Sequence, residues 1–225
     1  SWQMPVLQNS GVHLDTPELV TMLSFTSVKD YEDYIARLNK LPTLFEQTIV
    51  QMRNGVKNKI MPPQFLLTKI ARQCDDIVAM RMETSPFAKP VAQFPADMPQ
   101  ADQQRLKAAV LTAIQTKVIP AYQDFANFVR SDYAPYGRKN VGLWSLPDGA
   151  ARYKLQVKTQ TTTHKTPEEI HQIGLSEVRR IEGQMLEVAK KLGFADLKSF
   201  NASMEKNPAL HPKSRQEILD LYSKY

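Results

Sequence analysis

Apolar residues recur at intervals of three and four along most of this chain, which is the period of amphipathic helices. Tyr31, Tyr34 and Leu38 share one stripe behind a capping residue, Ser27. A second stripe repeats every four residues from Leu106 onward. The pattern therefore predicts a chain built mainly of helices.

Prolines divide this helical pattern into segments. Pro42 is predicted to open a helix, and Pro62 with Pro63 to open another that runs to about residue 80. Pro120 should kink or split the long helical pattern that starts near residue 101. Four prolines between residues 85 and 99 exclude a regular helix or a central strand, so this stretch is predicted to be an irregular crossover.

One stretch departs from the helical period. After a Pro-Asp-Gly turn at 147–149, apolar and polar residues alternate, which is typical of a half-buried strand. The two faces of this run carry Tyr153, Leu155 and Val157 against Lys154, Gln156 and Lys158. Thr166 with Glu169 then forms the capping box of the next helix.

We therefore predict a mainly α fold, a multi-helix layer of roughly seven to nine helices with one short β strand or hairpin near residues 151–163. The predicted organisation is a helical half over 1–133 that includes the Pro-rich crossover at 85–99, a turn and strand hook over 134–165, and C-terminal helices over 166–225. The last helical pattern is still running at Tyr225, and the chain starts at Ser1 without an initiator methionine or a signal-type segment, so we expect any export signal to have been removed or to lie upstream. We expect the chain to be a single helical portion of a larger protein.

The departing stretch also carries a resemblance. The residues concerned are Gly142 with Leu143, the turn at 147–149, Tyr153, the threonine run 159–163, Thr166 to His171, Gly174 with Leu175, and Glu177 with Val178. Their order resembles the middle portion of a bacterial family, domain of unknown function 885, whose members look like zinc metallopeptidases and are often lipoproteins. The resemblance implies a periplasmic or outer-membrane-anchored protein that uses a zinc-bound water to hydrolyse peptides.

The zinc motif of that family, a His-Glu-x-x type sequence, has no counterpart here, because the chain contains no His-Glu pair. Its histidines are His13, His164, His171 and His211, and no two of them have the spacing that places ligands on one helical face. The single cysteine, Cys74, lies on an apolar helical stripe and is predicted to be a core residue. We expect no catalytic residue, metal or cofactor in this chain, and the resemblance implies that the zinc-bearing catalytic portion is the missing C-terminal portion of the same protein.

Positive charge gathers in the hook. The net charge is +6, and residues 138–165 supply five of these six charges. One interpretation is that the hook borders a substrate groove and attracts a carboxylate, with Arg152, Tyr153, Lys154 and Lys158 as candidate groove residues and the strand pairing with an extended peptide. In the alternatives, these cations meet an acidic surface of the missing portion or face water.

These observations lead to two hypotheses of different classes. In the first, the chain is a non-catalytic helical fragment that lines the peptide-binding groove of a secreted zinc metallopeptidase. In the second, it is a stand-alone helical binding or scaffold module that docks a partner through its basic strand. Nucleic acid is not expected as a partner, because the aromatic residues fall on core stripes such as Tyr122, Phe125 and Phe128. No apolar run approaches the roughly 18 residues of a membrane-spanning segment.

Overall fold

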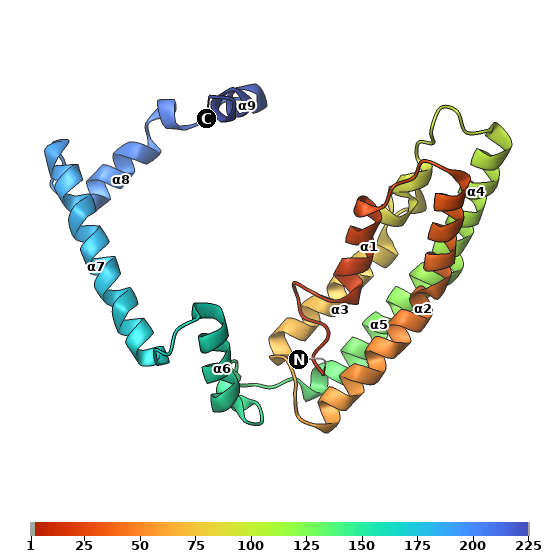
Figure 1. The fold of residues 1–225 in the computed structure, drawn as a ribbon, viewed down its shortest axis with the longest axis horizontal. Coiled ribbons are helices and arrows are strands. Elements are labelled where there is room, and N and C mark those ends of the chain that lie inside the picture. The colour runs from red at the N-terminus through yellow and green to blue at the C-terminus, as the bar shows by residue number, and fades with distance from the viewer. Residues whose placement is uncertain (1–2, 225) are drawn as a thin grey trace. The chain divides into compact units, whose positions relative to one another are not determined.

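A computed structural model describes residues 3–224 of the chain, and the fold is mainly α, as predicted (Figure 1). The chain divides into two compact units, residues 1–153 and residues 154–225. Within residues 3–224 there is no named β-strand, and β-pairing is limited to two isolated bridges, Leu7 with Ser10 and Pro63 with Arg138.

The first unit is built around long helices that run up and down beside one another, α1 and α3 in one direction and α2 and α4–α5 in the other (Figure 1). Helix α3 packs against α5, and α2 packs against both α4 and α5. The α-helices are α1 (Val12–Met22), α2 (Val28–Lys57), α3 (Gln64–Ala79), α4 (Gln100–Ala113) and α5 (Ile119–Phe128). Two π-helical turns, η3 (Ile114–Val118) and η4 (Val129–Tyr133), continue α4 and α5. The short 3-10 helix η1 (Met82–Thr84) precedes the predicted crossover, and the crossover itself carries the 3-10 helix η2 (Pro86–Val91).

Aromatic side chains form the centre of this unit. The ring of Phe45 lies 4.9 Å from that of Tyr122 and 5.0 Å from that of Phe125, which joins α2 to α5. Phe128 is also buried, so the prediction of a core aromatic stripe on α5 is confirmed. Cys74 is fully buried as predicted, and burial raises the pKa of its thiol to about 12. Phe87 of η2 is buried too, so the crossover contributes to the core.

The prediction that Pro42 opens a separate helix is wrong, because Pro42 lies inside the 30-residue helix α2. A proline inside a helix costs about 3 kcal/mol. Leu38, Leu41 and Phe45 flank it on the buried face, and burying each of these side chains contributes about 1.5–3 kcal/mol. Tertiary packing therefore outweighs the local signal. Pro17, likewise, lies inside α1.

Pro120 interrupts the regular α-helical bonding, as predicted, and the interruption takes the form of a π turn. It stands at the start of α5, directly after the π turn η3, where the N–H of Ile119 donates to the carbonyl of Ile114. In an uninterrupted α-helix the proline ring would clash with the carbonyl four residues earlier, at Thr116. We attribute the widened turn to this clash, which it relieves without ending the helix.

The predicted short strand near 151–163 is wrong, because this segment is helix α6 (Gly149–Thr161). The alternating run is largely exposed, with Tyr153 44% and Leu155 63% accessible. Among residues 3–224 no strand is present to pair with it, whereas a helix satisfies its own backbone N–H and C=O groups. The alternation of apolar and polar residues in this segment therefore does not correspond to the two faces of a strand.

The second unit consists of helices α7 (Pro167–Lys191), α8 (Leu197–Glu205) and α9 (Arg215–Tyr222), the 3-10 helix η7 (Pro208–Leu210) and the end of α6. The predicted capping box is present: the hydroxyl of Thr166 accepts from the N–H of Glu169, whose carboxylate accepts from the N–H of Thr166. Helix α9 ends at Tyr222, and Tyr225 lies outside the described residues. Along residues 3–224, no helix combines the length and apolarity needed to cross a membrane.

Candidate functional site

Arg138 organises the loop that precedes α6. Its Nε donates to the carbonyl of Met61 at 2.8 Å, and its Nη1 donates to the carbonyls of Asn140 at 2.8 Å and Gly142 at 2.7 Å. Its own backbone bonds to Pro62 and Gln64, which ties the loop to the start of α3. Partial burial lowers the pKa of this guanidinium, which nevertheless remains charged at neutral pH. The charge of Arg138 thus holds the loop rather than a ligand.

The same loop folds tightly around Trp144. A Cβ at Gly142 would collide with the indole ring of Trp144, and one at Gly149 would collide with the backbone of residues 143 and 144. The indole itself is 66% exposed. The glycines of the Gly-Leu and Pro-Asp-Gly motifs are therefore required by close packing, and they place α6 directly after this aromatic side chain.

Helix α6 carries all four predicted groove residues, and they play different parts. Nε of Arg152 donates to the carbonyl of Pro147 at 2.8 Å, so this side chain secures the turn before the helix. Tyr153 is 44% exposed. Lys154 and Lys158 are exposed, lie one helical turn apart on the same face, and have no ion-pair partner among residues 3–224. The exposed positive charge predicted for the hook is therefore present, but on a helix. The predicted strand-like pairing with the backbone of a peptide is excluded, because the backbone N–H and C=O groups of α6 bond to one another within the helix.

The donor set in the described chain does not fit zinc. Within residues 3–224, no group of three His, Cys, Asp or Glu side chains is close enough to hold a metal. His164 and His171 are exposed, and His13 is buried with its Nε2 3.0 Å from Oε1 of Gln73. Burial lowers the pKa of His13, against the weaker opposing effects of Gln73 and Asp15. His13 is thus a neutral side chain that joins α1 to α3.

Helix α7 presents an apolar stripe that the other helices of unit 2 leave largely uncovered. Val178, Ile181, Met185, Val188 and Leu192 follow one another at alternating steps of three and four, and each is between 40% and 60% exposed. Phe200 of α8 lies beside part of the stripe, around a hollow of about 240 Å³. In the described part of 154–225, Ala189 is the single buried residue. This spacing is typical of a helix face that packs against another helix.

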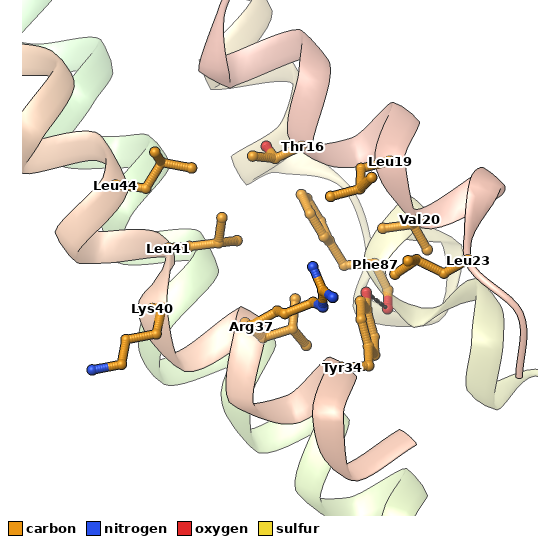
Figure 2. Close-up of a pocket in the computed structure, with 11 residues that line it drawn as sticks. Thr16, Leu19, Val20, Leu23, Tyr34, Arg37, Lys40, Leu41, Leu44 and Phe87 are labelled. Carbon is orange, nitrogen blue, oxygen red and sulfur yellow. Dashed lines mark hydrogen bonds between the residues drawn. The ribbon is translucent and has the colours of Figure 1, made fainter. Parts of the chain in front are cut away.

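Unit 1 contains an open apolar cavity of about 230 Å³ between α1 and α2 (Figure 2). Its lining residues are Thr16, Leu19, Val20 and Leu23 from α1 and the turn after it, Tyr34, Arg37, Leu38, Lys40, Leu41 and Leu44 from α2, and Phe87 from η2. No motif in the sequence indicated this site. The available signal was the pair of cations, Arg37 and Lys40, beside the apolar stripe of α2, but the facing wall comes from a separate helix.

The fold is mainly α and is shared with part of a longer chain: 97% of this chain matches 38% of the chain in the crystal structure of the "putative lipoprotein from Colwellia psychrerythraea", with a TM-score of 0.86 and 24% sequence identity. The sequence profile of the bacterial proteins of unknown function DUF885 matches residues 2–225. This chain belongs to that family, as the motifs around Gly142 to Val178 indicated. Among curated proteins, none matches it. The chain thus spans well under half the length of its structural relative.

Proposed function

We propose that this chain forms a non-catalytic helical wall of a larger cell-envelope peptidase, whose zinc is held by a different portion of the polypeptide. The observation that carries the proposal is the uncovered stripe on α7. Burying one large apolar side chain contributes about 1.5–3 kcal/mol. Five half-exposed residues of this kind on one helix face therefore indicate a surface that another part of a protein covers. Because the structural relative is much longer than this chain, we infer that a further portion of the same polypeptide packs against the α7 stripe.

The substrate-facing part of this wall is α6. Lys154 and Lys158 place two unpaired ammonium groups on one exposed helix face, and Tyr153 lies next to them in the sequence. Such a face attracts carboxylates by long-range electrostatics. We propose that it favours peptides with an acidic side chain or a free carboxyl end, and that the chain contributes charge and shape while the zinc portion supplies the chemistry.

The first experiment compares this chain with a polypeptide extended to the length of the structural relative. We expect zinc binding and peptide hydrolysis only in the extended protein, and slower amide exchange and lower exposure of α7 there. Tight stoichiometric zinc in the short chain, lost on His164→Ala or His171→Ala, contradicts the division of labour. Unchanged exchange along α7 contradicts the proposed interface.

A second candidate function is a stand-alone scaffold that docks an acidic partner through α6. The unpaired state of Lys154 and Lys158 supports it, but it leaves the α7 stripe without a cover. The two functions differ in one measurable respect. The scaffold predicts that the short chain is monomeric and resists proteolysis throughout 154–225, whereas the proposed wall predicts rapid cleavage in that unit and persistence of residues 1–153.

A further inference from the structure

The cavity between α1 and α2 has an apolar interior and an exposed apolar rim. Val20, Leu38 and Phe87 are buried beneath it, while Leu19 and Leu44 at its edge are 43% and 42% exposed. All these residues belong to the first unit, so the cavity does not depend on the second. Its position makes it independent of the function proposed above.

The polar groups in its wall are already occupied. The hydroxyl of Tyr34 donates to the carbonyl of Phe87 at 2.8 Å. The hydroxyl of Thr16 donates to the carbonyl of Val12 at 2.8 Å and lies 2.7 Å from that of Tyr122. A peptide entering the cavity would leave its own buried N–H and C=O groups unpaired, which costs about 1–3 kcal/mol for each group. An alkyl chain has no such requirement.

The charges at the cavity are of one sign. Arg37 and Lys40 are its charged lining residues, and no acidic residue lines it. The guanidinium of Arg37 projects over the cavity, while the ammonium of Lys40 points away from it (Figure 2). Asp33, one turn before Arg37, accepts from Nζ of Lys29 at 2.9 and 2.7 Å through its two oxygens. Arg37 has no hydrogen-bonded partner among residues 3–224, and its planar fork matches a carboxylate.

We propose that this cavity binds a single-chain alkyl carboxylate, with the hydrocarbon between α1 and α2 and the carboxylate paired with the guanidinium of Arg37. The apolar wall provides the affinity through removal of hydrocarbon from water. The guanidinium selects the negatively charged head. A neutral or cationic amphiphile of the same length gains only the first of these contributions.

The test is a calorimetric titration of the chain with octanoate, decanoate and dodecanoate below their micelle concentrations. Each added methylene should tighten binding by about fourfold until the cavity is full, since burying one methylene contributes about 0.8 kcal/mol. Dodecanol and dodecyltrimethylammonium at equal concentration serve as the neutral and cationic probes. We expect both to bind roughly tenfold more weakly than dodecanoate.

Two variants locate the site. Arg37→Met retains the aliphatic length and removes the charge, so it should weaken dodecanoate by roughly tenfold and leave dodecanol unchanged. Leu19→Trp fills the opening from an exposed position and should weaken both ligands. Lys57→Met is the matched control, because Lys57 is an exposed cation on the same helix outside the cavity, and it should bind dodecanoate as the parent chain does.

Four results would overturn the proposal. The first is the absence of saturable binding, and the second is equal affinity for dodecanoate and dodecyltrimethylammonium. The third is unchanged dodecanoate affinity in Arg37→Met, provided that its circular dichroism matches the parent chain. Loss of binding in the extended polypeptide also overturns it, because the cavity would then be covered by the protein itself.

Discussion

Residues 1–153 and 154–225 are both helical, but only the first unit surrounds its helices with other helices. In unit 1, aromatic contacts such as Phe45 with Tyr122 and Phe125 link α2 to α5. In the described part of unit 2, burial is restricted to Ala189, and the stripe on α7 remains open. The difference shows that the second unit has helices without a core of its own.

The two units use the same local signals to begin their helices. Ser27 and Asp30 form a capping box at the start of α2, and Thr166 and Glu169 form one at the start of α7. Capping satisfies backbone groups at a helix end but buries no apolar surface. Local signals are therefore sufficient to define a helix, and tertiary packing decides whether it unfolds cooperatively.

The largest expected effect comes from removing a core ring. Phe125→Ala should destabilise unit 1 by about 3–5 kcal/mol, because it leaves a cavity beside Phe45. Ile181→Ala, on the open stripe of α7, should cost less than about 0.5 kcal/mol. Urea unfolding followed by near-ultraviolet circular dichroism, which reports the buried tyrosines of unit 1, measures the first. A similar loss for both variants would show that unit 2 has a hidden core.

A second effect is expected from pH. The folded-state pKa of His13 is lowered, chiefly by burial, so its neutral form stabilises unit 1 above its unfolded pKa of about 6.5. That contribution should be lost progressively as the pH falls from about 6.5 through the lower folded value, because the unfolded chain then binds more protons. The unfolding midpoint of unit 1 should therefore decrease as the pH is lowered from about 7.5 to about 5.

The matched substitutions separate this histidine from other titrating groups. His13→Gln should flatten the pH dependence, whereas His171→Gln, at an exposed position of α7, should leave it as it is. If both variants retain the full slope, another group controls the acid response of unit 1.

A smaller effect separates the two capping boxes. Ser27→Ala and Thr166→Ala should each cost about 1 kcal/mol through loss of the cap. Ser27→Ala should lower the unfolding midpoint of unit 1, whereas Thr166→Ala should increase fraying at the start of α7 without shifting that midpoint. Amide exchange of residues 168–171 together with near-ultraviolet melting distinguishes these responses. An unchanged exchange pattern in Thr166→Ala would mean that the cap does not hold the start of α7.

The smallest effect on folding is expected on α6. The double change Lys154→Glu and Lys158→Glu should leave both units folded, because exposed lysines contribute little to stability. In the extended polypeptide it should reduce kcat/KM for substrates with an acidic or free-carboxylate end relative to neutral ones. Lys190→Glu, an exposed cation near the end of α7, is the control. Equal preference in the double variant and the parent protein would remove α6 from the substrate groove.

The sequence predicted the helical class, the core stripe of α5, the burial of Cys74 and the cap at Thr166, because each depends on residues close together in the chain. It failed at Pro42, where the burial of Leu38 and Phe45 outweighs the local cost of proline. It failed again at α6, where an alternating pattern had no partner strand. Both errors arise because neighbours distant in sequence determine the outcome.

The candidate sites follow the same division. The exposure of Lys154 and Lys158 follows from their charge. The hydrogen bonds from Arg152 to Pro147 and from Arg138 to backbone carbonyls depend instead on the path of the loop. The cavity beside Arg37 requires Leu19 and Leu23 to face α2 across a turn. No periodicity in either helix encodes that arrangement.

The π turn before Pro120 determines where this fold tolerates a change in chain length. A π turn accommodates one residue more than an α turn, so deleting Gln115, an exposed residue within it, lets the backbone return to ordinary helical bonding once Pro120→Ala has also removed the clash of the proline ring. Val110 before it and Phe125 after it then keep their places in the core. A deletion at Asn39 in α2 would instead rotate each later side chain by about 100° and turn Phe45 away from the core. Gain and loss of single residues among relatives should therefore concentrate at 114–118 rather than in α2.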